Sequence, residues 1–221
     1  MSKRADFMRF RRQMGPAGET AGSRAAGCRG ITSHRLALRY PSMDYGLLLI
    51  DAQEHFQPPR AVLARLERLL MFWRMVSMPV VATFEQDKGE LPKGLELPPQ
   101  TQRFEKAHFD ANREAAIREA LSAHKSWAVA GAETDVCVLQ SVLGLLAHGH
   151  EVRLLEDCLF SSEANPEPAI ARMRAPGAIP CTFKTLAYEI VGTVDRATWP
   201  AEWDQGLFPP PEDLPFPAVS P

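Results

Sequence analysis

The 221-residue sequence lacks an apolar run long enough to cross a bilayer. It also has few cysteines, at positions 28, 137, 158 and 181, and no two of them have the C-x-x-C spacing. The cysteines show no regular disulfide framework, and the pattern is typical of free thiols in a reducing compartment. Because 45% of the residues are hydrophobic, the chain can still bury a full core. We therefore expect a soluble, cytoplasmic protein with no membrane span.

Basic residues are scarce beyond position 43. Residues 1–43 carry nine Lys and Arg against two acidic residues, whereas residues 44–221 carry 16 against 25, a net charge of −9. Because residues 44–221 are acidic and binding to phosphates needs a basic surface, we predict no nucleic-acid partner. Residues 1–43 are rich in Arg and small residues, which suits a disordered extension, a transit peptide or an early start codon. Met43 precedes the first strand pattern, which favours a disordered extension or an early start.

Strand and helix patterns alternate through residues 44–207, which we expect to form one domain. Apolar runs predict strands at 45–51, 79–85, 102–105, 127–132, 151–155 and 179–183. Helical periodicity lies between the strands, at 58–77, from 110, at 134–149 and at 166–175, and after the last strand, at 186–191. This order predicts an α/β fold with a mostly parallel, doubly wound sheet covered on both faces. Many of the 19 prolines fall in loops or in residues 208–221, which we expect to be an extended tail.

Cys137 lies in the most informative stretch. The strand at 127–132 ends at Gly131, and Thr134 and Asp135 are suitable N-caps for a helix that Gly149 would end. Cys137 would then occupy the first turn, where free N–H groups and the helix dipole stabilise a thiolate. The alternative is a small buried side chain in the core, which is our interpretation of Cys158 and Cys181.

Two further residues are predicted to meet Cys137. Asp51 ends the first strand and Lys106 follows the third, and in a doubly wound sheet these strand ends share one edge with Cys137. A thiol, a carboxylate and an ammonium together can act as nucleophile, proton shuttle and electrostatic activator. The long loop 86–101 suits an active-site lid. Four residues could bind substrate: Phe56 and Phe84 as apolar pocket walls, and Glu85 and His108 as polar contacts. The alternative is core packing for Phe56, Phe84 and Glu85, and solvent exposure for His108.

Three segments within 45–192 resemble the isochorismatase-like cysteine hydrolases: LLLIDAQEHF, RFEKAHFDA and GAETDVCVLQSVLGLLAHGHEVRLLEDCLFSS. The resemblance implies a six-stranded sheet in a three-layer αβα fold, a Cys-Asp-Lys triad of Cys137, Asp51 and Lys106, and a homo-oligomer. It also implies a cis peptide before Glu133, so that the N–H groups of Glu133 and Cys137 form an oxyanion hole.

Differences between this sequence and the family's patterns narrow the range of expected functions. Nicotinamidases bind a metal through an Asp-x-His segment, but the matching ATFEQDKGELPKG has no histidine, and only His55 is near. We therefore expect neither metal nor cofactor. Isochorismatases of the family lack the cysteine, so Cys137 disfavours vinyl-ether cleavage, and the chain looks most like the isochorismatase domain-containing branch. We expect a hydrolase that cleaves a small amide-type substrate through a thioester. The alternatives are a hydrolase of another bond and a non-catalytic binding or scaffold protein.

Overall fold

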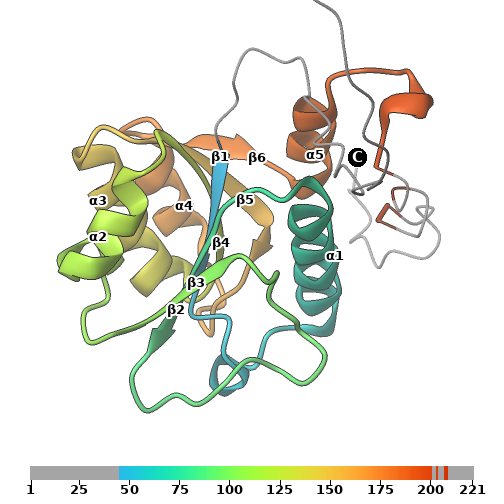
Figure 1. Cartoon of the computed structure of the whole chain (residues 1–221). Helices are drawn as coiled ribbons and strands as arrows, with labels where there is room; N and C mark the ends of the chain where they lie inside the picture. The colour runs from blue at the N-terminus through green and yellow to red at the C-terminus, as the bar shows by residue number, and fades with distance from the viewer. Residues whose placement is uncertain (1–44, 201–202, 204–206, 209–221) are drawn as a thin grey trace, which may run out of the picture. The chain divides into compact units, whose positions relative to one another are not determined.

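A computed structural model describes residues 45–200, 203, 207 and 208 (Figure 1). The predicted extension, residues 1–43, and positions 209–221 of the predicted tail lie outside these residues. Within the described part of the chain, no helix has both the length and the apolar composition needed to span a membrane.

Six parallel strands form one sheet in the order β3-β2-β1-β4-β5-β6. They are β1 (Tyr45–Ile50), β2 (Val80–Glu85), β3 (Thr101–Lys106), β4 (Ser126–Gly131), β5 (Glu151–Leu159) and β6 (Ile179–Cys181). The strand order reverses between β1 and β4. In open parallel sheets the crevice at this switch, beside the carboxyl ends of the strands, is where ligands bind.

Helices cover both faces of the sheet. On one side lie α1 (Arg60–Val76) and α5 (Phe183–Val191); on the other lie α2 (Ala115–Ser122), α3 (Leu139–Ala147) and α4 (Glu167–Arg174) (Figure 1). Along β1, Leu47 and Leu49 face the first core, whereas Leu48 and Ile50 face the second. A strand buried on both faces is apolar at every position, which explains its unbroken hydrophobic run. The predicted three-layer αβα fold is confirmed, and all of its strand pairs are parallel.

Several predicted boundaries are wrong by a few residues. β5 runs on to Leu159, so Asp157 and Cys158 belong to the strand; its register with β4 shifts near Gly131, which accommodates the extra length. β6 ends earlier than predicted, at Cys181. There the Thr182 side chain accepts a hydrogen bond from the Thr185 N–H and caps α5, so the chain turns into a helix.

An aromatic cluster covers the outer side of α1 and α5. Trp203 is buried, with its ring 5.7 Å from Phe72 and 4.9 Å from Trp199. Phe208, the first residue of the predicted tail, has its ring 5.0 Å from Phe183 of α5. The described end of the chain therefore packs on the helix layer farthest from the Cys137 helix.

Candidate active site

Asp51 is the first residue after β1, and its carboxylate is completely buried. Its backbone φ of 43° lies in the left-handed region, which is uncommon for residues other than glycine and turns the chain out of the strand. Thr83 of β2 makes two hydrogen bonds with Asp51. The Thr83 carbonyl accepts from the Asp51 N–H at 3.1 Å, and the Thr83 hydroxyl donates to Asp51 Oδ1 at 2.9 Å. The carboxylate is thus fixed at the carboxyl edge of the sheet.

Lys106 is the last residue of β3, and only 1% of it is exposed. Its Nζ lies 2.7 Å from Asp51 Oδ2, donates to Cys137 Sγ at 3.4 Å and donates to the His108 carbonyl at 3.2 Å. The ammonium thus makes an ion pair with Asp51 and two hydrogen bonds, to Cys137 and to the His108 carbonyl. The structure therefore brings together Asp51, Lys106 and Cys137, called the triad below.

Cys137 lies in a π-helical turn, Thr134–Val138, that leads into α3, and it is 1% exposed. The predicted N-caps are wrong, because Glu133 is the capping position and makes no side-chain cap. Thr134 and Asp135 bond to the end of β5 instead. The Thr134 hydroxyl donates to the Phe160 carbonyl at 3.0 Å, and Asp135 accepts from the Ser161 hydroxyl.

The connection from β4 to this turn is tightly constrained. Gly131 has a φ of +117°, and a Cβ at this position would collide with the Ile50 carbonyl. Only glycine lets the ends of β1 and β4 approach so closely. The following Ala132–Glu133 peptide is cis, as the family resemblance implied. The Glu133 carboxylate accepts from the Ser162 N–H at 3.0 Å and from the Ser162 hydroxyl. No sequence pattern predicted this contact.

The electrostatics of the triad leave the proton on sulfur. Burial raises the pKa of Cys137 to about 12; the charge of Asp51 also raises it, and Lys106 opposes both. Burial raises the pKa of Asp51, and this effect outweighs the charge of Lys106, which lowers it. Burial lowers the pKa of Lys106, but its interactions with Asp51 and Cys137 outweigh this and raise it. Desolvation therefore opposes the thiolate that we expected the helix turn to stabilise.

The donor atoms do not suit a metal ion. Donors of Asp51, Glu85 and Cys137 lie within 4.8 Å of one another. The Lys106 ammonium, however, already contacts Asp51 and Cys137 and supplies the positive charge there. A divalent ion in the same place would repel it. His55 is exposed, with its ring 5.3 Å from that of Phe56, and adds no ligand to this cluster.

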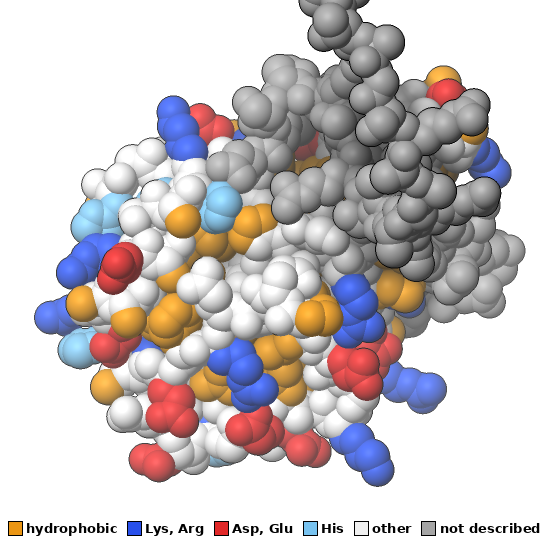
Figure 2. Space-filling model, viewed as in Figure 1, with side chains coloured by type: hydrophobic (Ala, Val, Ile, Leu, Met, Phe, Trp, Pro, Cys, Tyr) orange, Lys and Arg blue, Asp and Glu red, His pale blue; other side chains and the backbone are white. Residues whose placement is uncertain are grey.

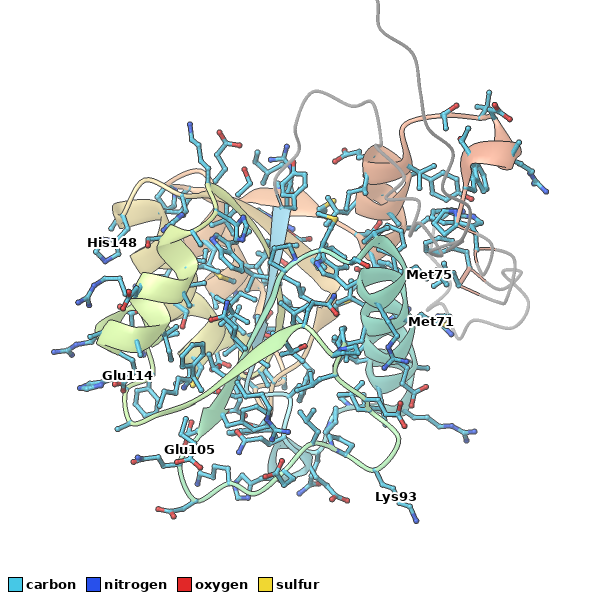
Figure 3. The ribbon with its side chains drawn as sticks, viewed as in Figure 1. Met71, Met75, Lys93, Glu105, Glu114 and His148 are labelled. Atoms are coloured by element: carbon cyan, nitrogen blue, oxygen red, sulfur yellow. The ribbon has the colours of Figure 1, made fainter. Side chains whose placement is uncertain are left out.

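A cavity of about 460 Å³ lies at the edge of the sheet formed by β2 and β3. It is lined by residues from β2, β3 and the loops after β1 and β2: Gln53, Phe84, Glu85, Asp87, Gly89, Glu90, Arg103, Phe104 and Glu105. Glu105 lies at the lower end of β3 in Figure 3, and acidic side chains gather along the lower rim of the molecule in Figure 2. The triad does not line the cavity. The Glu85 Oε2 accepts from Cys137 Sγ at 3.5 Å, on the opposite face of β2 from the Phe84 side chain.

The candidate substrate contacts fall in different places. Phe84 and Glu85 line the cavity, whereas Phe56 packs against the core beside α1. The His108 ring is exposed and pairs with Glu114 at 2.8 Å. We did not predict Gln53 as a cavity residue, although its position two residues after Asp51, near the carboxyl end of β1, could have indicated it.

The comparisons with known proteins identify the family and the fold. The family model of the isochorismatase domain matches residues 45–185. This chain belongs to the isochorismatase family. Isochorismatase domain-containing protein 2 from Bos taurus is 32% identical over 154 residues, which cover 66% of this chain and 74% of that protein. Isochorismatase family protein 1A from Dictyostelium discoideum is 28% identical over 158 residues, which cover 65% and 77%.

Solved structures of the isochorismatase fold superpose on the chain. The MAR1 ribonuclease from Caenorhabditis elegans has a TM-score of 0.70 at 24% identity, covering 80% of this chain and 95% of that one. N-carbamoylsarcosine amidase from Thermoplasma acidophilum has a TM-score of 0.55 at 15% identity, covering 64% and 97%. YcaC from Escherichia coli, described as an octameric hydrolase of unknown specificity, has a TM-score of 0.62 at 22% identity, covering 66% and 78%. At these identities the likeness shows the fold alone.

Proposed function

We propose that this isochorismatase-like hydrolase cleaves the C–N bond of a small amide-type substrate, with Cys137 as nucleophile. The observation that carries the proposal is the contact of Lys106 with both Asp51 and Cys137 at a buried sheet edge. Such an arrangement provides a nucleophile, a base and a cation in one place. The existence of an amidase on this fold, from T. acidophilum, supports the bond type.

In the first half of the reaction, sulfur attacks the substrate carbonyl. As the S–C bond forms, the thiol proton passes to Asp51, whose raised pKa makes it a stronger base. Lys106 stabilises the negative charge while it moves from carboxylate to sulfur and then to the carbonyl oxygen. When the tetrahedral intermediate collapses, the C–N bond breaks and Asp51 returns the proton to the leaving nitrogen. An amine leaves and a thioester remains on Cys137.

Water completes the cycle. Asp51 takes one proton from a water molecule, and the water oxygen attacks the thioester carbonyl. The C–S bond then breaks, sulfur recovers a proton from Asp51, and the acid product leaves. In this scheme the N–H groups of Glu133 and Cys137 hold the oxyanion, and losing one such donor in other enzymes lowers kcat by about 10²–10³-fold.

The surroundings of the site favour a small molecule over RNA. One structural relative is described as a ribonuclease. In this chain, however, the cavity at β2 and β3 is lined by Glu85, Asp87, Glu90 and Glu105, with Arg103 as the only Lys or Arg in its lining. This lining repels a phosphate backbone. We further propose a cytoplasmic homo-oligomer, because its described cysteines are free thiols and the E. coli relative is described as an octamer.

The test combines turnover with detection of the covalent intermediate. The protein would be incubated with small amides, ureido compounds and isochorismate. Released amine would be measured, and adducts on Cys137 would be located by mass spectrometry. Acrylamide is a suitable first probe, since the structure of YcaC from Pseudomonas aeruginosa contains it covalently. Cys137→Ala and Asp51→Asn should each lower kcat by about 10³-fold or more with the fold intact.

Cys181→Ala is the matched control, because Cys181 is also buried but lies outside the triad. It should keep full turnover. Full activity of Cys137→Ala would refute the assignment. Isochorismate cleavage without amide cleavage would favour a hydrolase of another bond. A protein that turns over nothing and forms no adduct would favour a binding or scaffold role.

A further inference from the structure

Glu85 brings a second carboxylate against the nucleophile. It is the last residue of β2, and its Oε2 accepts from Cys137 Sγ at 3.5 Å. Strand alternation puts its side chain on the same face of β2 as that of Thr83, whose hydroxyl donates to Asp51. One carboxylate oxygen of Asp51, one of Glu85 and the Cys137 sulfur all lie within 4.8 Å of one another. The sulfur therefore has two carboxylates as neighbours.

Glu85 differs from the triad in its access to solvent. The triad residues are each at most 1% exposed, whereas Glu85 is only partly buried. Lys106 and Thr83 already bind the Asp51 carboxylate. Within the part of the chain that the structure describes, the Cys137 thiol is the one donor that binds the Glu85 carboxylate. Glu85 therefore receives its protein hydrogen bond from the nucleophile and is the member of the group that water can reach.

Acylation of the sulfur removes this hydrogen bond. In the proposed reaction the thiol proton leaves when the sulfur attacks, so the sulfur of the thioester carries no hydrogen. The Glu85 oxygen beside it then lacks its donor, and a carboxylate oxygen without a donor is costly wherever bulk water is excluded. Because Glu85 is partly exposed, a water molecule can enter from the solvent and supply the missing donor.

The geometry puts this water molecule where the second half of the reaction needs it. Hydrogen bonds of about 2.8 Å let one water molecule bridge two oxygens up to about 5.6 Å apart. The oxygens of Asp51 and Glu85 are closer than this, at 4.8 Å or less. One water molecule can therefore donate to both carboxylates at once, with its oxygen next to the acyl group on the sulfur.

We propose that Glu85 is a positioning residue that holds the water molecule for hydrolysis of the thioester. The inference rests on the proposed function, in which Asp51 takes one proton of this water. The other proton stays hydrogen-bonded to Glu85 Oε2 while the O–C bond forms, and it leaves with the acid product. When the C–S bond breaks, Asp51 returns its proton to the sulfur. The thiol then donates to Glu85 again, which restores the resting site.

The experiment measures the two halves of the reaction separately with 4-nitrophenyl acetate. The sulfur attacks the ester carbonyl, the thiol proton passes to Asp51, and the C–O bond breaks to release 4-nitrophenolate. The absorbance of 4-nitrophenolate gives the rate constant of acylation. After rapid removal of the reagent, loss of the acetyl mass from the Cys137 peptide gives the rate constant of deacylation. The readout is the ratio of deacylation to acylation at one pH.

Two variants of Glu85 should lower this ratio. Glu85→Gln keeps the shape but replaces a charged acceptor by a weaker neutral one, so the ratio should fall at least about threefold. Glu85→Leu removes the acceptor, so the ratio should fall at least about tenfold, because a misplaced reactant can cost about 10²-fold in rate. Glu119→Leu, at an exposed position of α2, is the matched control and should leave the ratio unchanged.

Two results would overturn the inference alone: a ratio in the Glu85 variants equal to that of the wild type, or an equal fall in Glu119→Leu. In both cases the thioester still forms and is hydrolysed, so the proposed hydrolase stands. If Glu85→Leu does not fold, the ratio for Glu85→Gln decides. If Cys137→Ala releases 4-nitrophenolate as fast as the wild type, the sulfur is not the nucleophile, and the inference and the proposed function fall together.

Discussion

Lys106 Nζ lies 2.7 Å from Asp51 Oδ2, although their strands, β3 and β1, are not neighbours in the sheet. The lysine reaches past the end of β2 and keeps its ammonium in a fully buried place. A charge in such a place is tolerated only when a partner of opposite sign holds it. The pair therefore links function to stability.

Removal of the ammonium should destabilise the fold. Lys106→Met leaves Asp51 buried without its counter-charge, and we expect a loss of about 3 to 5 kcal/mol in the free energy of unfolding, measured in urea. Lys125→Met is the matched control, because Lys125 forms an exposed ion pair with Glu151 at 3.7 Å. It should lose about 0.5 kcal/mol or less. Equal effects in the two variants would contradict the buried-pair assignment.

The hydroxyl of Thr83 should set the acidic limb of activity. Its hydrogen bond to Asp51 Oδ1 lowers the pKa of this carboxyl, against the larger raising effect of burial. Asp51 must be ionised to accept the thiol proton, so activity rises as pH rises through its pKa. Thr83→Val should raise this pKa further and move the acidic limb of kcat/KM to higher pH.

Thr101→Val is the control for that measurement. Its hydroxyl donates to the Pro98 carbonyl at 2.7 Å at the opposite end of the sheet. The pH profile of this variant should match the wild type. An unshifted limb in Thr83→Val would show that Asp51 is not the base.

Stability should fall in alkali. The thiol of Cys137 ionises near pH 9.0 in the unfolded chain but at about 12 in the fold, because burial disfavours the thiolate. The pKa of Cys181 is likewise raised to about 11 by burial. A group with a raised folded pKa contributes stability below its unfolded pKa and loses it as pH rises towards the folded value. The free energy of unfolding should therefore decrease from pH 9 upward.

The contribution of Cys137 can be separated by substitution. Cys137→Ser carries no thiol, so its stability should fall less steeply between pH 9 and 11 than that of the wild type. The comparison is made by urea unfolding at each pH. Identical slopes would mean that the Cys137 thiol is not desolvated in solution.

Gly131 should not tolerate a side chain. In Gly131→Ala the new methyl group meets the Ile50 carbonyl at a φ of +117°, so overpacking and backbone strain add. We expect a loss of about 3 kcal/mol or more in the free energy of unfolding. Gly149→Ala, with a φ of +83° but open space around its Cβ, is the control and should lose only about 1 kcal/mol. Equal losses would show that strain alone acts at Gly131.

Local patterns were sufficient to predict the order of strands and helices along the chain, because hydrophobic periodicity and turn residues depend only on residues close together in the sequence. They also placed Asp51, Lys106 and Cys137 at one edge, since parallel strands end together. The boundaries of β5 and β6 were missed because a register shift beside Gly131 and the Thr182 cap decide them. The caps expected at Thr134 and Asp135 failed because Phe160 and Ser161, just after β5, bind both side chains.

The sequence by itself determined the α/β architecture, the family and the meeting of Asp51, Lys106 and Cys137 at one sheet edge, because the order of elements and the motif spacing do not depend on the details of packing. Only the tertiary structure decided that Cys137 keeps its proton at rest, since desolvation depends on what surrounds the sulfur. It alone also placed the Glu85 carboxylate against the sulfur, because that contact joins residues 52 positions apart.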